Sequence, residues 1–247
     1  MNFFRNVVFL AAIAGLCAGL AMSAMQIFGT APLILQAETF ENAAAEAPAA
    51  HSHDAADSTE ASAGHHHGSD AWEPEDGFER NAYTVLANLV TGIGFALVLV
   101  AFSEFFGGIG NWRQGLLWGF AGFATFALAP SLGLPPELPA MPAADLVARQ
   151  AWWIATVAGT AIGLALAVFG RSPWLAVAGL AIIVAPHLIG APQPEDWSSP
   201  VPEGLHHQFV VAVTISNLVF WSVLGLVAGA MRTRLSADLP AGKPLAA

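Results

Sequence analysis

The chain has 247 residues, of which 55% are hydrophobic and 11% are charged, and its mean hydropathy is +0.59. This composition excludes a water-soluble globular protein, because such proteins carry about 25% charged residues. The formal net charge of −10 excludes a protein that binds nucleic acids through a basic surface. The acidity is local, because segment 37–79 holds eleven acidic residues and no Lys or Arg.

Six apolar stretches follow one another along the chain, and each is a candidate membrane span. They cover residues 7–28, 82–103, 115–129, 151–169, 173–189 and 209–231. A helix over 82–103 is roughly 33 Å long, which is enough for a hydrocarbon core of about 30 Å. The stretch 173–189 is the weakest candidate, so five spans are the alternative. We expect an all-α integral membrane protein, a bundle of about six transmembrane helices.

The first stretch resembles a signal peptide, because Arg5 precedes an apolar run with small residues around Ala21. Its apolar character continues to Leu35, which favours an uncleaved span. Glycines spaced four apart, such as Gly115 and Gly119, predict tight contacts between helices. The expected domains are a first helix with its external extension (1–36), a disordered acidic and histidine-rich periplasmic loop (37–80), five further helices (81–231) and a cytoplasmic tail (232–247).

The basic residues predict the orientation of the chain in the membrane. With six spans, six of the eight basic residues lie on the side of both termini, which the positive-inside rule makes cytoplasmic. Arg80 and Arg149 lie on the outer side, together with sixteen of the eighteen acidic residues and all eight histidines. Carboxylates and neutral imidazoles are ligands for divalent transition metals. The outer face is therefore expected to attract metal cations.

The loop between the first two spans is expected to be disordered over 42–76, because it holds no aliphatic residue larger than Ala. A solvated linker is one interpretation of this segment. The other is a tether that collects metal ions, since His-rich tracts bind metals such as Ni, Co, Cu or Zn. Its histidines are His51, His53, His65, His66 and His67.

A second metal-binding candidate follows residues 199–202, whose sequence Ser-Pro-Val-Pro is typical of a helix start. Glu203 and His207 would then lie four residues apart on one helix face, with His206 beside them. A carboxylate and an imidazole at this spacing can share one cation. The alternative is that these histidines only bond to water at the membrane interface.

His187 lies within an apolar stretch and follows Pro186, whose missing N–H leaves a carbonyl without its helical partner. Such a polar group usually lines a cavity or the protein interior. It either joins the metal site, with Glu38 or Glu137, or forms a hydrogen bond between helices. Other residues of the spans are candidates for an ion pathway, although packing is their more common role. The pathway candidates are Met22, Met25, Gln26, Glu38, Asn88, Glu137 and Asn217.

Motifs of ATPases and of common hydrolases are absent from the sequence. Its one lysine, Lys243, lies in the terminal tail, so the chain holds no phosphate-binding loop and no ATPase site. It also lacks the arrangements of Ser–His–Asp hydrolases, of H-E-x-x-H metalloproteases and of zinc cysteine clusters. We therefore do not expect an enzyme.

Three motifs resemble the CbtA family, described as cobalt transporter subunits of bacteria. The first is Gln26 followed by PLIL at 32–35 and AETFE at 37–41. The second and most specific is GLPPELP at 133–139 followed by RQAWW at 149–153, and the third is HLIGAPQP at 187–194. The resemblance spans most of the chain except 42–76, with Ala140 where the family pattern has glycine.

The resemblance implies uptake of divalent cobalt for corrinoid (cobalamin) synthesis, together with a small one-span partner subunit, CbtB, that bears histidines. It also implies five spans, whereas the charge pattern predicts six, and the disputed segment contains His187. We therefore expect a multi-pass permease subunit of the bacterial inner membrane that moves Co²⁺, or Ni²⁺, and holds no fixed cofactor. It would contact lipid, the partner and further copies of itself. A non-transporting accessory that delivers metal to a separate permease is the alternative.

Overall fold

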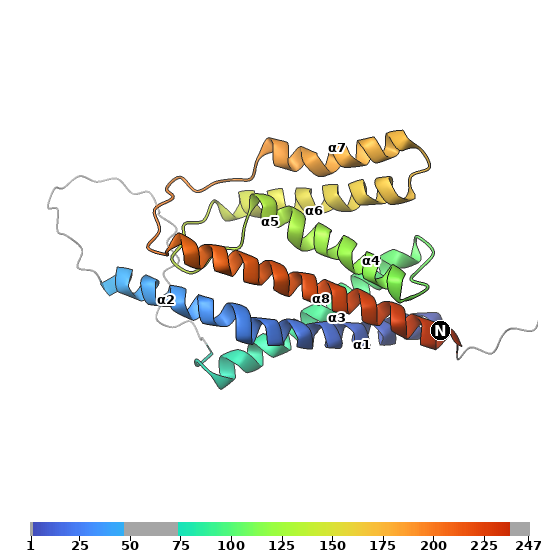
Figure 1. Cartoon of the computed structure of the whole chain (residues 1–247), viewed down its shortest axis with the longest axis horizontal. Coiled ribbons are helices and arrows are strands. Elements are labelled where there is room, and N and C mark those ends of the chain that lie inside the picture. Colours follow the sequence, from blue (N-terminus) through green and yellow to red (C-terminus); the bar gives the residue numbers. More distant parts are fainter. Residues whose placement is uncertain (1, 47–73, 238–247) are drawn as a thin grey trace, which may run out of the picture.

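The computed structural model describes residues 2–46 and 74–237, and these are arranged as six helical rods (Figure 1). The first rod joins α1 (Asn2–Met25), the π-helix η1 (Gln26–Thr30) and α2 (Ala31–Glu46). The third rod joins α4 (Trp112–Phe123), the π-helix η2 (Ala124–Leu128) and α5 (Ala129–Gly133). The others are α3 (Phe78–Glu104), α6 (Leu146–Phe169), α7 (Pro173–Ile189) and α8 (Glu203–Ala237).

Five of the six rods are long and apolar enough to cross a membrane, and α7 is a shorter apolar helix. The expected all-α membrane fold is therefore confirmed, with five long candidate spans among the described residues. The predicted bounds differ at three places. The first rod remains helical over 37–46 and α3 begins at Phe78, both within the segment 37–80 that was expected to be a disordered loop. At the other end, α8 continues to Ala237, beyond the expected last residue of the bundle at 231.

In both rods that contain a π-helix, a proline lies two residues after the π-helix ends. In η1 the N–H of Ala31 bonds to the carbonyl of Gln26, five residues earlier, and η2 repeats this pattern. Pro32 and Pro130 follow the two π turns at the same spacing. A proline removes a backbone donor and clashes with the preceding turn, and a local π turn lets a helix continue past it. The first helix therefore does not end near Leu35.

The helices pack closely where glycines face one another, as the spacing predicted. A Cβ atom added to Gly115 of α4 would collide with the backbone carbonyl of Gly225 in α8. Gly15 of α1 meets the backbone of α3 in the same way, and Gly163 of α6 meets that of α7. Such close approach is the usual basis of helix association in lipid, where no hydrophobic effect drives helices together.

The main core lies where α1, α3, α4 and α8 meet. Leu10, Val100 and Leu224 are buried there. Trp221 of α8 stacks on Phe126 of η2 with ring centroids 5.5 Å apart. These large side chains fill the space between the glycine contacts and hold the four helices as one bundle.

An antiparallel hairpin of α6 and α7 lies along this bundle, with α6 next to α5 and η2 (Figure 1). Because α7 runs back along α6, the start of α1 and the end of α8 lie at the same end of the molecule. This end also holds the end of α3, the start of α4 and the α6–α7 connection. We call it the basic end and the opposite one the acidic end, for the charges described next.

Candidate functional site

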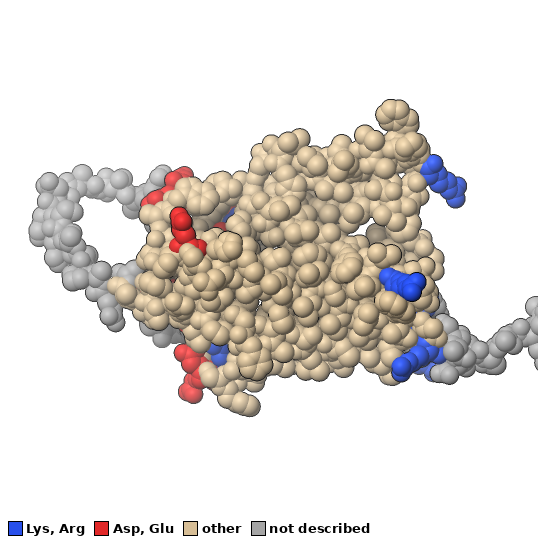
Figure 2. Space-filling model, viewed as in Figure 1, with Lys and Arg blue, Asp and Glu red and all other residues tan. Residues whose placement is uncertain are grey.

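Charged side chains separate between the two ends of the bundle (Figure 2). The acidic end carries most of the described carboxylates, and its two arginines, Arg80 and Arg149, form ion pairs there. Six spans predict the remaining basic residues on the opposite side, and Lys243, which is one of them, lies outside the described residues. At the basic end are Arg5, Arg113, Arg171, Arg232 and Arg234.

The acidic end includes the exposed connection between α7 and α8. Within it, the hydroxyl and the amide N–H of Ser198 donate to Asp196, and these hydrogen bonds lower the pKa of the Asp196 carboxyl. The carboxylate is thereby kept ionised to lower pH. A surface of this kind attracts cations and raises their local concentration.

The described histidines also lie at the acidic end. His187 is in the last turn of α7, and His206 and His207 are in the first turns of α8. Glu203 begins α8 directly after the Ser-Pro-Val-Pro sequence, so Glu203 and His207 are exposed and one turn apart. His206 is half-buried, with its Nε2 3.0 Å from the carbonyl oxygen of Pro136. The loop histidines His51, His53, His65, His66 and His67 lie outside the described residues.

These side chains do not form a preassembled metal centre. Within the described part of the chain, no group of three His, Cys, Asp or Glu residues could hold a metal ion. His187 contacts the ring of Trp152 edge-on, with centroids 5.7 Å apart at 76°. Trp152 donates its indole N–H to the carbonyl oxygen of Pro186 over 3.1 Å. The structure thus places His187 in a contact between α6 and α7.

Several pathway candidates take part in contacts between the first rod and α3. Asn88 donates to Gln26 Oε1 at 2.7 Å and to Ser23 Oγ at 3.2 Å. Met22 packs against the main core, and Met25 is half-buried. These contacts fit the structural interpretation of the four candidates, which join helices and fill space.

Three glutamates near the ends of the bundle each pair with an arginine from another element. Two of the pairs use both carboxylate oxygens: Arg80 lies 2.6 and 3.3 Å from those of Glu38, and Arg232 lies 2.5 and 3.2 Å from those of Glu104. The third pair is different. Arg149 Nη2 contacts Glu137 through one oxygen, Oε2, at 3.0 Å. Bidentate pairs are the more strongly held, so Glu137 is the least firmly paired of the three.

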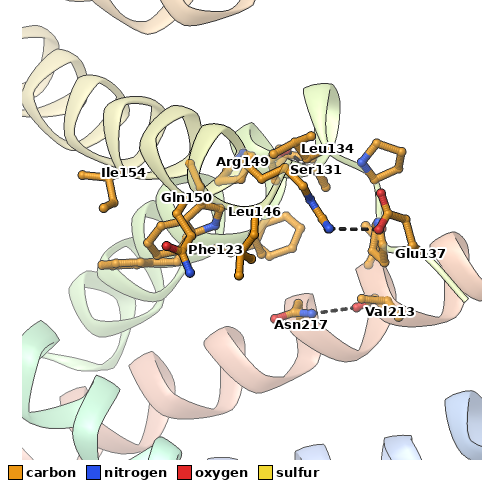
Figure 3. A pocket seen from close by; sticks show the side chains of 18 residues that line it. Phe123, Ser131, Leu134, Glu137, Leu146, Arg149, Gln150, Ile154, Val213 and Asn217 are labelled. Carbon is orange, nitrogen blue, oxygen red and sulfur yellow. Dashed lines mark hydrogen bonds and ion pairs between the residues drawn. The ribbon is translucent and has the colours of Figure 1, made fainter. Parts of the chain in front are cut away.

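The Glu137–Arg149 pair lies in a pocket of about 620 Å³ at the acidic end (Figure 3). Its walls come from η2, α5, the α5–α6 connection, the first turns of α6 and the middle of α8. Two pathway candidates, Glu137 and Asn217, therefore line one cavity, which begins beside the carbonyl that His206 contacts. The polar lining residues are Ser131, Glu137, Arg149, Gln150, Thr214 and Asn217.

Sequence reasoning did not identify Arg149, Gln150 or Thr214 as site residues. A basic residue at the start of an apolar stretch is usually a boundary charge. Arg149 meets Glu137 because the α5–α6 connection folds back over the start of α8, where Leu138 is buried. The available signal was the pair of motifs at 133–139 and 149–153, which places these polar residues in neighbouring segments.

Comparison with known proteins gives one match. A family model described as probable cobalt transporter subunit (CbtA) matches residues 4–233. No match was found among curated proteins or among solved structures.

Proposed function

Because the chain belongs to the CbtA family of probable cobalt transporter subunits, we propose that it is the metal-conducting subunit of a Co²⁺ uptake system. It would lie in a bacterial inner membrane and supply corrinoid synthesis. Both termini would be cytoplasmic, and the acidic end would face outward. The observation that carries this proposal is the separation of charge along a bundle of apolar helices.

Six crossings are supported by the course of α7. This helix has 17 residues and is roughly 25 Å long, a little less than the hydrocarbon core of about 30 Å. Local thinning of the bilayer can accommodate such a difference. The start of α1 and the end of α8 lie at one end (Figure 1), which requires an even number of crossings. The arginines at this end match the positive-inside rule.

Metal capture at the acidic end is the next step of the proposal. Glu203, His206 and His207 would take up the ion, His187 at the end of α7 would assist them, and the histidines of segment 37–80 would collect metal for this site. Mixed imidazole and carboxylate ligands suit Co²⁺ and Ni²⁺. A transport site must also release its ion, so loosely arranged ligands are more suitable than a closed cage.

The word subunit in the family description implies a partner. We expect this to be a CbtB-like protein with one span, and the exposed apolar faces of α6 and α7 are available for lipid, for this partner or for a second copy of the chain. Co-purification from membranes tests the association directly.

The capture site is tested by measuring Co²⁺ accumulation in cells that carry His187→Ala, His206→Ala and His207→Ala together. Accumulation should fall strongly at equal membrane abundance. His206→Gln alone is the control for the bond to Pro136, because glutamine can also hydrogen-bond to this carbonyl. Unchanged accumulation in the triple variant would exclude the site. Reconstitution in liposomes separates a permease from an accessory, since only a permease admits Co²⁺ without another protein.

A further inference from the structure

The pocket around Glu137 extends from the acidic end into the bundle. Glu137 lies on the α5–α6 connection, whereas Asn217 is fourteen residues beyond the first residue of α8, or roughly 20 Å along its axis. Both line the same cavity. The pocket therefore runs from the acidic end, where His206 lies, to the depth at which the helices are apolar.

The acceptor groups of this pocket are oxygens. Asn217 uses its amide nitrogen to donate to the carbonyl of Val213 at 3.0 Å (Figure 3), so its amide oxygen remains as an acceptor. Ser131 and Thr214 donate their hydroxyl hydrogens to helix carbonyls at 2.9 and 2.7 Å, which leaves their oxygen lone pairs. Gln150 adds a further amide. Oxygens of this kind bind hydrated divalent cations or the water around them.

The size of the pocket fits a cation that keeps its water. One water takes about 30 Å³ of liquid, so a shell of six takes on the order of 180 Å³. The cavity of about 620 Å³ holds such an ion with space around it.

Among the residues that line the pocket, Arg149 carries the one permanent positive charge. It neutralises Glu137 through a single oxygen, and the Arg149 and Glu137 side chains retain 30% and 25% of their exposure. Glu137 is the one acidic residue that lines the pocket, and Arg149 balances its charge. The arginine thus acts as a resident counter-ion, and its partial exposure lets it turn away to solvent.

We propose that this pocket is a binding site for a hydrated divalent cation, in which the arriving ion displaces Arg149 from Glu137. A dication supplies twice the charge of the guanidinium that it replaces, whereas a monovalent ion gains nothing by the exchange. The pair therefore favours divalent over monovalent cations. The inference rests on the proposed transport function for its biological meaning, but binding can be measured without transport.

The test is Co²⁺ binding to the purified full chain in lipid nanodiscs. Glu137→Gln should raise the Kd by about tenfold or more, as loss of a partner outside the first coordination shell does. Arg149→Gln should lower the Kd, because it leaves Glu137 without its internal competitor, and it should make Na⁺ compete with Co²⁺. If the ion pair has a purely structural role, both substitutions should change the Kd for Co²⁺ in the same direction. That result would overturn the proposal.

Glu104→Gln is the matched control, since it removes a glutamate from an Arg–Glu pair at the basic end and should leave the Kd unchanged. The double variant Glu137→Gln with Arg149→Gln keeps two neutral groups that can hydrogen-bond, so it tests binding if Glu137→Gln alone does not fold. It should bind as weakly as Glu137→Gln. A double variant with the wild-type Kd would contradict the pocket. If wild-type cells accumulate no Co²⁺, the transport function fails, whatever the binding data show.

Discussion

Trp152 of α6 is tied to Pro186 of α7 by a hydrogen bond from its indole N–H to the proline carbonyl, 3.1 Å long. Trp152 is 8% exposed, so water does not replace this donor easily. The same carbonyl accepts the N–H of Gly190 at 3.0 Å. The bond joins the start of α6 to the end of α7, next to His187, and so fixes the hairpin at the acidic end of the molecule.

Replacing Trp152 by Phe should loosen this end of the hairpin. Phe keeps a ring next to His187 but removes the donor. Because the Pro186 carbonyl still accepts the N–H of Gly190, the expected loss is the net value of one hydrogen bond, about 0.5–1.5 kcal/mol. Thermal unfolding of the purified protein in detergent measures the effect. Trp153→Phe is the control, because Trp153 is 39% exposed; equal losses in the two variants would show that the bond to Pro186 contributes nothing.

The contact between α4 and α8 should not tolerate a side chain at Gly115. A Cβ atom there would collide with the backbone of Gly225 and lie 2.9 Å from Gly229, so Gly115→Ala must separate the helices, at a cost of about 1–3 kcal/mol. Gly94→Ala is the matched control, because a Cβ atom at Gly94 meets no atom within 4 Å. Its stability should stay equal or rise slightly, and a similar loss at both glycines would contradict the packing argument.

The Glu104–Arg232 pair should contribute to stability and not to metal binding. Glu104 and Arg232 are 23% and 26% exposed, and hydrogen bonds to charged groups are worth about 1.5–3 kcal/mol. Glu104→Gln and Arg232→Gln should each lower the unfolding free energy, and the double variant should lose less than the sum of the two. A double-mutant cycle in detergent measures this coupling, and simple additivity would argue that the two residues do not interact.

The sixth crossing can be tested with single cysteines in a Cys17→Ser background. Ser172 lies between α6 and α7, and Glu195 lies between α7 and α8. If α7 crosses the membrane, an impermeant maleimide added to intact cells should label Glu195→Cys and not Ser172→Cys. Labelling of both positions from outside would place the connections on one side and leave five crossings.

The helices of this protein could be predicted well from hydropathy, because apolar length is what a membrane requires. The continuation of the first helix to Glu46 could not, since it depends on a π turn before Pro32 that hydropathy does not detect. The position of Glu203, His206 and His207 in the first turns of α8 could also be predicted, because the Ser-Pro-Val-Pro sequence indicates where that helix starts. The glycine contacts followed in the same way, because residues four apart share one helix face.

The pocket was harder to predict. Glu137 and Asn217 were candidates for separate reasons, but their shared cavity depends on how the α5–α6 connection folds. Leu138 holds that connection against α8, and this contact joins segments far apart in the sequence. The ion pair with Arg149 follows from the same tertiary contact. Local patterns carry no information of this kind.

The π turn in η2 also determines which side chains reach the pocket. It adds one residue to a turn, so every position after it is rotated by about 100° relative to an uninterrupted α-helix. Ser131, which follows the π turn, lines the pocket in this rotated orientation. Deletion of Ala127 would restore the α-helical phase and turn Ser131 away from the cavity, together with the chain that leads to Glu137. If each residue of this helix is substituted in turn, the positions that affect the pocket should recur with helical periodicity before the π turn and after it. The second series should be offset from the first by one residue.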